Sequence, residues 1–547
     1  MSTETAKKVV IVGGVAGGMS AATRLRRLDE NAQITVFEKS NYVSYANCGL
    51  PYYLGGVIEW HDALVLQTPE GLKAQFNIDV NVAHEVIAID RASQSVKVRN
   101  LTDGSEFEVE YDNLILSPGA ATIKPNIPGI ERSYQLRTVE DVDTLFAAIA
   151  HHPQHVTVVG GGYIGVETAE NLVHRGINVT LVEAAPQVFA PIDEEMALTV
   201  SDVMKINGID VRLNSTLTEI RENSVVLADG TEIPTELVVM AIGVRPDTTL
   251  AVGAGLEVGP KGGIKVNEYH QSSDPKIYAV GDACEKIDAL DETAVLIPLA
   301  NLANRHGRVT ADHISGHPVS PTKATGTSIV KVFDLAVAAT GWNERRLKAA
   351  GMNYVAVHTH PGSHAGYYPG TEQMMLKLLF NPATGQIYGA QGIGGEGVDK
   401  RIDVLATAMQ AGMKANRLMD LELAYAPPFS SAKDPVNMLG YIADNIMAGT
   451  VKTIQWHELS TELAAGALLL DVRSAYEYGR GHIEGSLNIP LTEIRDRHNE
   501  ITNKQLIVMD ASGHRAHTAS RLLAQLGYSV KNLDGGYATW KSSPAAN

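Results

Sequence analysis

Cysteine is the residue that this chain has least of. Only two cysteines, Cys48 and Cys284, occur among 547 residues. Two thiols so far apart in the sequence supply neither a disulfide framework nor a zinc cluster. Such scarcity is typical of a reducing compartment, where thiols are catalytic or inert. We therefore expect a cytoplasmic protein whose two cysteines have separate roles.

Cations are also in deficit, and long apolar runs are missing. The 45 Lys and Arg residues face 62 Asp and Glu residues, giving a net charge of −17. This balance argues against nucleic acid as a partner, because phosphate binding needs clustered cations. No apolar run reaches the roughly 18 residues of a membrane span, and the first residues lack a signal-peptide core. The hydrophobic share of 44% excludes bulk disorder, and the length predicts roughly three or four domains.

Glycine, by contrast, is abundant, and its placement is informative. The apolar strand Val9–Val12 leads into the turn Gly13–Gly18 and a helix-compatible segment, and a second strand then ends in Glu38. The dinucleotide fingerprint has this order, with an acid about 20 residues on that binds a ribose hydroxyl. Val15 replaces the middle glycine, so a tight turn without a ligand is the alternative.

A second turn repeats the pattern in full. The strand Val156–Val159 precedes glycines at 160, 162 and 165, and a second strand ends in Glu183, 23 residues after Gly160. Glycines at these positions let a pyrophosphate approach a helix N-terminus. An acid at the end of the second strand accepts from both ribose hydroxyls and repels a 2′-phosphate, which favours NADH over NADPH. Two such turns predict two dinucleotide sites, one for a flavin and one for a nicotinamide.

A third segment supports the flavin site. Ile277–Ala283 is a strand ending in Gly-Asp, which places the Asp282 carboxylate where a flavin ribityl hydroxyl can bind. Residues 115–120 and 241–246 have the pattern of two chain crossings between nucleotide domains. We therefore expect a discontinuous flavin domain at 1–122 and 244–320, with a nicotinamide domain at 123–243.

These segments resemble the two-dinucleotide-binding flavoprotein disulfide reductases. The run from Ser44 to Tyr52, SYANCGLPY, resembles more closely the coenzyme A disulfide reductases and the NADH-dependent persulfide reductases with a fused rhodanese domain. The resemblance covers nearly the whole chain. It implies an α/β protein with two Rossmann-like domains, an α+β dimerisation domain at 325–450 and an α/β rhodanese-like domain at 455–547. FAD, NADH, coenzyme A as substrate or bound ligand, and a homodimer with shared active sites are implied with it.

The turns and the resemblance together predict contacts to the cofactors and to coenzyme A. The cofactor contacts are Gly13, Val15, Ala16, Gly18, Glu38, Lys39, Asp282, Ala300, Gly160, Gly162, Tyr163, Ile164, Gly165, Glu167, Glu183 and Gly243. The substrate contacts are Ser20, Arg24, Arg27, Ser44, Asn47 and Lys433. Arg24 and Arg27 lie one turn apart on the first helix, where plain surface solvation is the alternative to phosphate binding.

Cys48 is the expected redox centre. Val43 occupies the approximate position where general disulfide reductases carry a second cysteine, so an internal redox disulfide is unavailable. A single cysteine can instead cycle through a mixed disulfide, a persulfide or a sulfenic acid. We expect a helix start after Gly49 to lower the thiol pKa; an inert buried cysteine is the alternative. Cys284 is expected to be a packing residue.

Two aromatic clusters stand in the expected dimerisation domain, at 364–369 and 425–429. By the resemblance, Tyr367 and Tyr425 are catalytic residues that reach the cysteine of the other subunit. A tyrosine hydroxyl can protonate a leaving thiolate. Ordinary interface aromatics are the alternative.

The C-terminal region resembles a rhodanese domain that lacks its nucleophile. The stretches 470–473 and 533–540 resemble the two rhodanese signatures, and the family's C-x-x-G-x-R loop is represented by DASGHR, from Asp510 to Arg515. A carboxylate at the cysteine position cannot carry a sulfane sulfur. We expect Asp510 to occupy the anion-binding nest of its loop, and the domain to serve docking, substrate delivery or stability.

Three functions follow from these features. The leading hypothesis is an FAD enzyme that uses NADH and Cys48 to reduce coenzyme A disulfide, coenzyme A persulfide or polysulfide. The alternative is an NADH oxidase or peroxidase that cycles Cys48 through sulfenic acid. A sulfur-binding or sensing protein without turnover is the third, and the intact nucleotide turns argue against it.

Overall fold

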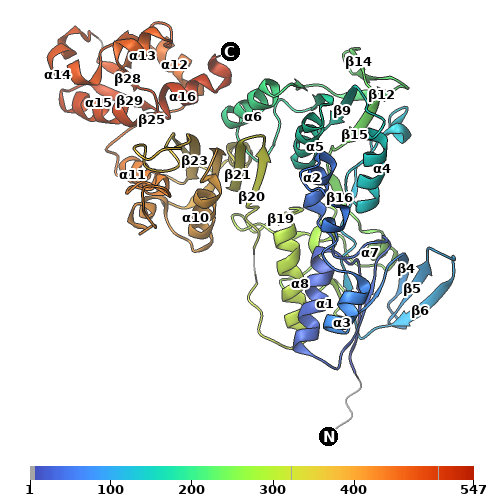
Figure 1. The fold of residues 1–547 in the computed structure, drawn as a ribbon. Coiled ribbons are helices and arrows are strands. Elements are labelled where there is room, and N and C mark those ends of the chain that lie inside the picture. The colour runs from blue at the N-terminus through green and yellow to red at the C-terminus, as the bar shows by residue number, and fades with distance from the viewer. Residues whose placement is uncertain (1–5, 322, 503, 547) are drawn as a thin grey trace. The chain divides into compact units, whose positions relative to one another are not determined.

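The computed structural model describes residues 6–321, 323–502 and 504–546. The chain forms two compact units (Figure 1). The first comprises Met1–Pro186 and Gly208–Gly326, and the second comprises Gln187–Asn207 and Thr327–Asn547. None of the helices in the described ranges has the length and apolar character that a membrane crossing requires.

The first unit contains a parallel sheet of order β17-β7-β1-β2-β3. Its strands are β1 (Lys8–Val12), β2 (Gln33–Phe37), β3 (Asp79–Asn81), β7 (Asn113–Leu116) and β17 (Ile277–Ala279). Helices α1 (Ala16–Leu28) and α8 (Ala300–Ile314) lie side by side against one face (Figure 1). Val9 and Ile11 pack with these helices, whereas Val10 and Val12 pack on the opposite face. Burial of both faces explains the continuous apolar run in the sequence.

Smaller elements complete this part of the unit. An antiparallel sheet of three strands covers the face of Val10 and Val12. It consists of β4 (His84–Asp90), β5 (Ser95–Asn100) and β6 (Glu106–Glu110). The predicted chain crossings pair with each other as β8 (Ala120–Thr122) and β16 (Val244–Pro246). This part of the chain also contains helices α3 (Pro69–Phe76) and α7 (Thr249–Gly253). Strands β18 (Lys286–Ile287) and β19 (Ala294–Val295) form an antiparallel pair.

A second parallel sheet in the first unit has the order β11-β10-β9-β15. Its strands are β9 (His155–Val159), β10 (Asn178–Val182), β11 (Ile209–Arg212) and β15 (Leu237–Met240). Helices α4 (Val139–Ile149) and α5 (Tyr163–His174) and the antiparallel strands β12 (Leu217–Ile220), β13 (Ser224–Leu227) and β14 (Glu232–Pro234) accompany it. Both glycine turns therefore connect a strand to a helix, which confirms the two predicted Rossmann-like arrangements.

The second unit begins with an antiparallel sheet of order β20-β21-β24-β23-β22. Its strands are β20 (Ser328–Val332), β21 (Leu335–Gly341), β22 (Val355–Thr359), β23 (Met374–Phe380) and β24 (Ile387–Gly394). Helices α10 (Val398–Gln410) and α11 (Pro435–Met447) share a hydrophobic core with this sheet. Helix α9 (Glu344–Ala349) follows β21, and α6 (Glu194–Ile206) packs against β20 and β21.

The C-terminal part of the second unit is a parallel sheet of order β25-β29-β28-β26-β27. Its strands are β25 (Thr453–Ile454), β26 (Leu468–Asp471), β27 (Leu487–Asn488), β28 (Gln505–Met509) and β29 (Ser529–Leu533). Its helices are α12 (Leu459–Ala464), α13 (Ala475–Gly479), α14 (Ile494–Arg497), α15 (His514–Gln525) and α16 (Gly536–Lys541). Alternate residues of β28 enter two hydrophobic clusters, one on each face of the sheet.

A buried charge network holds the parts of the second unit together. The Lys377 ammonium lies 2.5 Å from a Glu195 carboxylate oxygen on α6 and 2.6 Å from one of Glu344. His358 on β22 bridges Glu195, at 3.0 Å, and Asp534 after β29, at 2.5 Å. Buried charges persist when each has a partner. Helix α6 lies inside the range expected for the nicotinamide domain, yet its side chains pack here.

Candidate active site

The two glycine turns have the geometry of dinucleotide-binding turns. Gly160 has a φ of +111°, and a Cβ there would lie 2.4 Å from the Ala241 carbonyl oxygen. A Cβ on Gly165 would lie 1.8 Å from the Gly160 oxygen, whereas one on Gly162 would meet nothing within 4 Å. The outer glycines thus permit the tight turn and the helix packing, and the middle glycine leaves the turn open for a phosphate group.

The first turn repeats this crowding at its ends. A Cβ on Gly13 would lie 2.1 Å from the Ser117 oxygen, and one on Gly18 would lie 2.0 Å from the Gly13 oxygen. Val15, at the middle position, is half-buried and is the N-cap residue of α1. Neither α1 nor α5 has a side-chain cap. Helix N-termini of this kind favour an anion, so the residues fit two bound dinucleotides.

The acids that end the second strands lie at these turns. Glu38 accepts hydrogen bonds from the Gly14 amide at 2.7 Å and the Ser40 amide at 2.8 Å. Burial raises the pKa of Glu38, and these amides oppose the shift. Glu183 accepts from the Gly161 amide at 2.6 Å and the Ala185 amide at 2.7 Å. Each carboxylate thus sits beside the turn where a nucleotide ribose is expected.

The remaining predicted cofactor residues take up different positions. Helix α5 begins with Tyr163 and Ile164, and Glu167 follows one turn later. Ala300 is the first residue of α8, which also lacks a side-chain cap. Ala16 begins α1. Gly243 is exposed, with a φ of +113°. Lys39 is exposed, and its ammonium lies 3.9 Å from Asp247.

Cys48 lies in a short 3₁₀ turn, Asn47–Gly49, that runs directly into α2 (Leu50–Gly55). It is a free and exposed thiol, whereas Cys284 is free and buried. Helix α2 packs on α5, and Gly55 permits the close approach, since a Cβ there would lie 2.0 Å from the Asn171 amide oxygen. The sequence motif around Cys48 is therefore held against the helix of the second glycine turn.

The prediction that the helix start lowers the pKa of Cys48 is wrong, because in this structure that pKa is raised. Desolvation of the sulfur raises the pKa, and the negative charges of Glu167 and Asp282 raise it further. Asp282 is itself half-buried, and burial raises its pKa. Since α2 has only six residues, its dipole is short, and desolvation together with the two carboxylates outweighs it.

Glu167 belongs to the surroundings of the thiol as well as to the nucleotide turn. Its carboxylate accepts a hydrogen bond from the Tyr52 hydroxyl at 3.2 Å. Burial raises the pKa of Glu167 to about 7, so this group gains and loses a proton near neutral pH. Sequence reasoning missed the pair because its members lie 115 residues apart. The only signal was that Tyr52 ends the motif around Cys48.

The predicted substrate contacts divide into free and engaged side chains. Arg24 forms an ion pair with Asp312 on α8 at 2.7 Å, whereas Arg27 is exposed. Ser20 donates to Asn304 at 2.7 Å. Two others belong to the Cys48 segment. Ser44 donates its amide to the Gly14 carbonyl at 2.8 Å, and Asn47 donates to the Arg137 carbonyl at 3.3 Å.

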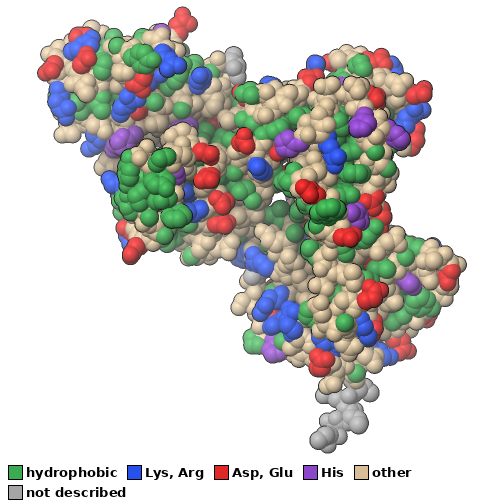
Figure 2. All heavy atoms as spheres, in the orientation of Figure 1, with side chains coloured by type: hydrophobic (Ala, Val, Ile, Leu, Met, Phe, Trp, Pro, Cys, Tyr) green, Lys and Arg blue, Asp and Glu red, His purple; other side chains and the backbone are tan. Residues whose placement is uncertain are grey.

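The second unit carries the predicted tyrosines on its surface. Tyr367 is 76% exposed and Tyr425 is 48% exposed, and their hydroxyl oxygens lie 2.9 Å apart. Lys433 is exposed, and its ammonium lies over the Tyr441 ring at 5.8 Å. Phe429 is 70% exposed. Figure 2 shows hydrophobic side chains gathered on the surface around α11, an arrangement typical of an interface.

The loop after β28 is closed by its own carboxylate. Asp510 is 1% exposed and accepts hydrogen bonds from the Gly513 amide at 2.5 Å and the Arg515 amide at 2.9 Å. The Arg515 guanidinium forms two hydrogen bonds with Glu477, at 2.7 and 2.9 Å. The loop thus has the form of an anion nest, and Asp510 is the anion in it.

Three family models match the chain. Pyridine nucleotide-disulphide oxidoreductase matches residues 7–307, its dimerisation domain matches 327–435, and the rhodanese-like domain matches 455–543. A coenzyme A disulfide reductase of Staphylococcus haemolyticus is 36% identical over 444 residues, covering 80% of this chain and 100% of that protein.

Two solved structures are similar over almost their full length. The reduced CoADR-RHD of Bacillus anthracis is 49% identical with a TM-score of 0.97, covering 98% of each chain. The NAD-dependent persulfide reductase from A. fulgidus is 38% identical with a TM-score of 0.92, covering 97% of this chain and 100% of that one. The predicted resemblance is confirmed, and it implies a flavin and a pyridine nucleotide as cofactors. This chain is an enzyme that belongs to the pyridine nucleotide-disulphide oxidoreductase family, with its dimerisation domain and a rhodanese-like domain.

Proposed function

We propose that the enzyme reduces the S–S bond of a small disulfide or persulfide with electrons from NADH, and that Cys48 is its single redox cysteine. Coenzyme A disulfide or coenzyme A persulfide is the favoured substrate. For the persulfide, coenzyme A persulfide, NADH and one proton give coenzyme A, hydrogen sulfide and NAD⁺. The observation that carries the proposal is that Cys48 is the exposed cysteine of a chain whose other cysteine is buried.

Cys48 acts as the nucleophile. Its thiolate attacks one sulfur of the substrate, a new S–S bond forms, and the second substrate sulfur leaves and takes up a proton. Bound flavin and NADH supply the two electrons that return the mixed disulfide to two thiols. Tyr367 and Tyr425 are hydroxyl donors proposed to serve the Cys48 of the other subunit of a homodimer. The matched dimerisation domain supports that assembly.

Glu167 is the proton carrier of the first unit in this proposal. Its pKa of about 7 suits it to accept a proton and to release it near neutral pH. Its ionised form opposes ionisation of Cys48, so the carboxyl and the thiol cannot both be deprotonated without a cost. A proton shared between them would leave one negative charge in the site.

The proposed cofactor and ligand preferences are based on an acid at the second glycine turn and on exposed polar side chains. Glu183 at the second turn favours the free ribose hydroxyls of NADH over the 2′-phosphate of NADPH. Arg27, Lys433 and Asn47 are exposed and are proposed coenzyme A contacts. Arg24 reaches such a ligand only by leaving Asp312. A cytoplasmic location, the domain boundaries and the individual site assignments stay predictions.

The C-terminal part is proposed to work without sulfur transfer. The carboxylate of Asp510 already occupies the nest that would otherwise stabilise a thiolate. A docking, delivery or stabilising role therefore suits this part, and sulfane sulfur is handled at Cys48.

The proposal is tested by steady-state NADH oxidation by the flavin-bound full-length enzyme. The substrates are coenzyme A persulfide, coenzyme A disulfide, polysulfide, hydrogen peroxide and oxygen alone. We expect the highest kcat/KM with one of the coenzyme A substrates, and NADPH should replace NADH poorly. Cys48→Ser should keep its flavin absorbance and lose this turnover; unchanged persulfide reduction by that variant rejects the proposal.

An NADH oxidase or peroxidase is the alternative, because an exposed single cysteine also suits a sulfenic acid cycle. It predicts that NADH consumption with oxygen or peroxide exceeds consumption with the coenzyme A substrates. Trapping Cys48 with a sulfenic acid reagent during turnover separates the two cycles.

A further inference from the structure

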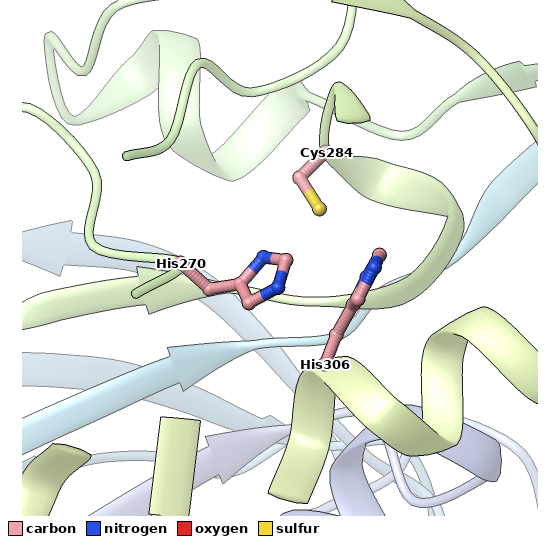
Figure 3. Close-up of side chains that lie close together, drawn as sticks. All are labelled: His270, Cys284 and His306. Atoms are coloured by element: carbon pink, nitrogen blue, oxygen red, sulfur yellow. The ribbon is translucent and has the colours of Figure 1, made fainter. Parts of the chain in front are cut away.

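Three buried side chains in the first unit converge from segments that are distant in the sequence. His270 precedes β17, Cys284 follows the Gly281–Ala283 turn, and His306 lies on α8. One nitrogen of each imidazole and the Cys284 sulfur all lie within 4.8 Å of one another. Figure 3 shows the sulfur directed between the two rings. No role in the proposed reaction uses these residues.

Two ring nitrogens of this cluster lack hydrogen-bond partners among the described residues. His270 is 7% exposed, His306 is 3% exposed and Cys284 is 0% exposed. Within the described part of the chain, the Nδ1 atoms of both histidines have no hydrogen-bond partner. The Cys284 thiol donates only a weak hydrogen bond to the Gly281 oxygen, at 3.4 Å. Buried nitrogens are usually paired, so these two indicate a missing ligand.

A second buried cluster of possible metal ligands makes the contrast clear. Asp193, Glu195 and Glu344 also bring three ligand atoms together. There the Lys377 ammonium lies within 2.9 Å of all three carboxylates, so a cation of the protein itself fills the site. No ion pair among the described residues involves His270 or His306, whose ring centroids lie 4.0 Å apart.

The protonation states suit a metal. Burial lowers the pKa of His270 to about 3 and that of His306 to about 2, so both rings are neutral at physiological pH. The neutral imidazole is the form that binds metals. Burial raises the pKa of the Cys284 thiol to about 11. A metal ion that displaces the thiol proton would therefore release one proton on binding.

We propose that His270, Cys284 and His306 form a binding site for one soft metal ion, and that this ion is Cu⁺ in preference to Zn²⁺. Metal–nitrogen and metal–sulfur distances of about 2.0–2.3 Å place the ligand atoms of such a site roughly 3.5–4 Å apart. The cluster, with its atoms within 4.8 Å, needs only a small closure.

Charge selects the monovalent ion. Two neutral imidazoles and one thiolate make a neutral complex with Cu⁺, whereas Zn²⁺ leaves a net positive charge in a buried place. The ammonium of Lys286, which is 5% exposed, adds to that cost. It donates to the Gly281 and Cys284 carbonyl oxygens at 2.7 and 3.0 Å. A thiolate is also a preferred ligand of Cu⁺.

The ion would connect three elements of the first unit. It would join the loop of His270, the turn that carries Asp282, and α8. His270 has a φ of +62°, a backbone conformation that few residues other than glycine adopt. A ligand that binds only the folded protein stabilises it, so metal binding should raise the unfolding temperature.

The test uses the flavin-bound full-length chain with Cys48→Ser, which leaves Cys284 as the one thiol. The protein is titrated without oxygen with Cu⁺, in competition with a chromophoric Cu⁺ chelator, and in parallel with Zn²⁺. We expect one equivalent of Cu⁺, an ultraviolet absorption band from the copper–thiolate bond, a higher unfolding temperature, and at least about tenfold weaker Zn²⁺ binding.

Site variants decide the assignment. Adding Cys284→Ser or His306→Gln should abolish tight binding of the one Cu⁺ equivalent. His151→Gln, at an exposed histidine of the same unit, should keep that binding. Copper binding that survives Cys284→Ser overturns the site, and Zn²⁺ binding as tight as Cu⁺ overturns the charge argument. If the site variants fail to fold, X-ray absorption of the copper-loaded Cys48→Ser protein decides: sulfur and nitrogen neighbours support the site, and their absence rejects it.

Discussion

Two loops of this enzyme, each leading into a helix, have opposite effects on a negative charge: one opposes it and the other stabilises it. The loop of Cys48 carries an exposed thiol whose pKa is raised by desolvation and by the carboxylates of Glu167 and Asp282. The loop of Asp510 carries a buried carboxylate that two backbone amides stabilise. The loop that is built to hold an anion thus has no sulfur, and the loop that has the sulfur does not favour its ionisation.

The largest expected difference between the loops is in turnover. Cys48→Ser should lower kcat/KM for the sulfur substrate by about a thousandfold or more, because no other thiol can replace the nucleophile. Asp510→Asn should change it by less than about twofold, since Asp510 is not in the reaction path. NADH oxidation with matched flavin content measures both. A comparable loss in the two variants would mean that the C-terminal loop takes part in the chemistry.

The next largest effect concerns the residue that links the C-terminal part to the rest of the second unit. Asp534→Ala leaves the buried His358 with one charge partner fewer and should cost about 3 kcal/mol of unfolding free energy. Urea unfolding followed by tryptophan fluorescence reports on it, because Trp342, Trp456 and Trp540 lie in this unit. A cost near zero would show that the contact does not hold the unit together.

The same contact gives the second unit a pH dependence. Burial lowers the pKa of His358, but the charge of Asp534 and the hydrogen bonds to Asp534 and Glu195 raise it to about 9. Protonated His358 therefore favours the folded state. Its contribution is fully present below a pH of about 6.5, the ordinary pKa of histidine, and is lost as the pH rises through about 9. Urea midpoints between pH 6 and 10 test this, and Asp534→Ala should flatten the profile.

A smaller effect is expected inside the Asp510 loop. Asp510→Ala removes the acceptor of two partly buried amides and should cost about 1–3 kcal/mol of unfolding free energy. Asp510→Asn keeps one acceptor oxygen and should cost less. Thermal unfolding of the three proteins measures the order. An Ala variant as stable as the parent would contradict the interpretation of Asp510 as a structural anion.

The smallest expected effect is on the thiol pKa of Cys48. Glu167→Gln removes a negative charge near Cys48, so the thiol pKa should fall, and the difference should appear above pH 7, where Glu167 is ionised. The pH dependence of iodoacetamide alkylation measures it, since buried Cys284 is protected. Glu131→Gln, at an exposed acid of the same unit, is the control. An unchanged midpoint would remove Glu167 from the account of the thiol.

Local patterns were enough to predict the nucleotide turns and the position of Asp510 in the anion-binding nest of its loop. Strand β10 ends at Val182, directly before the predicted acid Glu183, and β1 begins one residue earlier than predicted. Turns of this kind follow from the order of neighbouring residues, so the sequence contains their signal. The pKa of Cys48 was predicted in the wrong direction, because its desolvation and its neighbours Glu167 and Asp282 result from segments elsewhere in the chain.

The sequence by itself determined that this enzyme has two dinucleotide turns, one cysteine in the motif for which we propose redox chemistry, and no cysteine in its C-terminal loop. Only the tertiary structure decided which distant residues meet: Tyr52 with Glu167, His358 with Asp534, and Cys284 with His270 and His306. The physical reason is that side-chain identity sets what a residue can do, whereas its charge state and ligands depend on the neighbours that folding brings to it. Cys284 shows the difference, because a residue expected only to pack becomes a candidate metal ligand once two unpartnered imidazoles lie beside it.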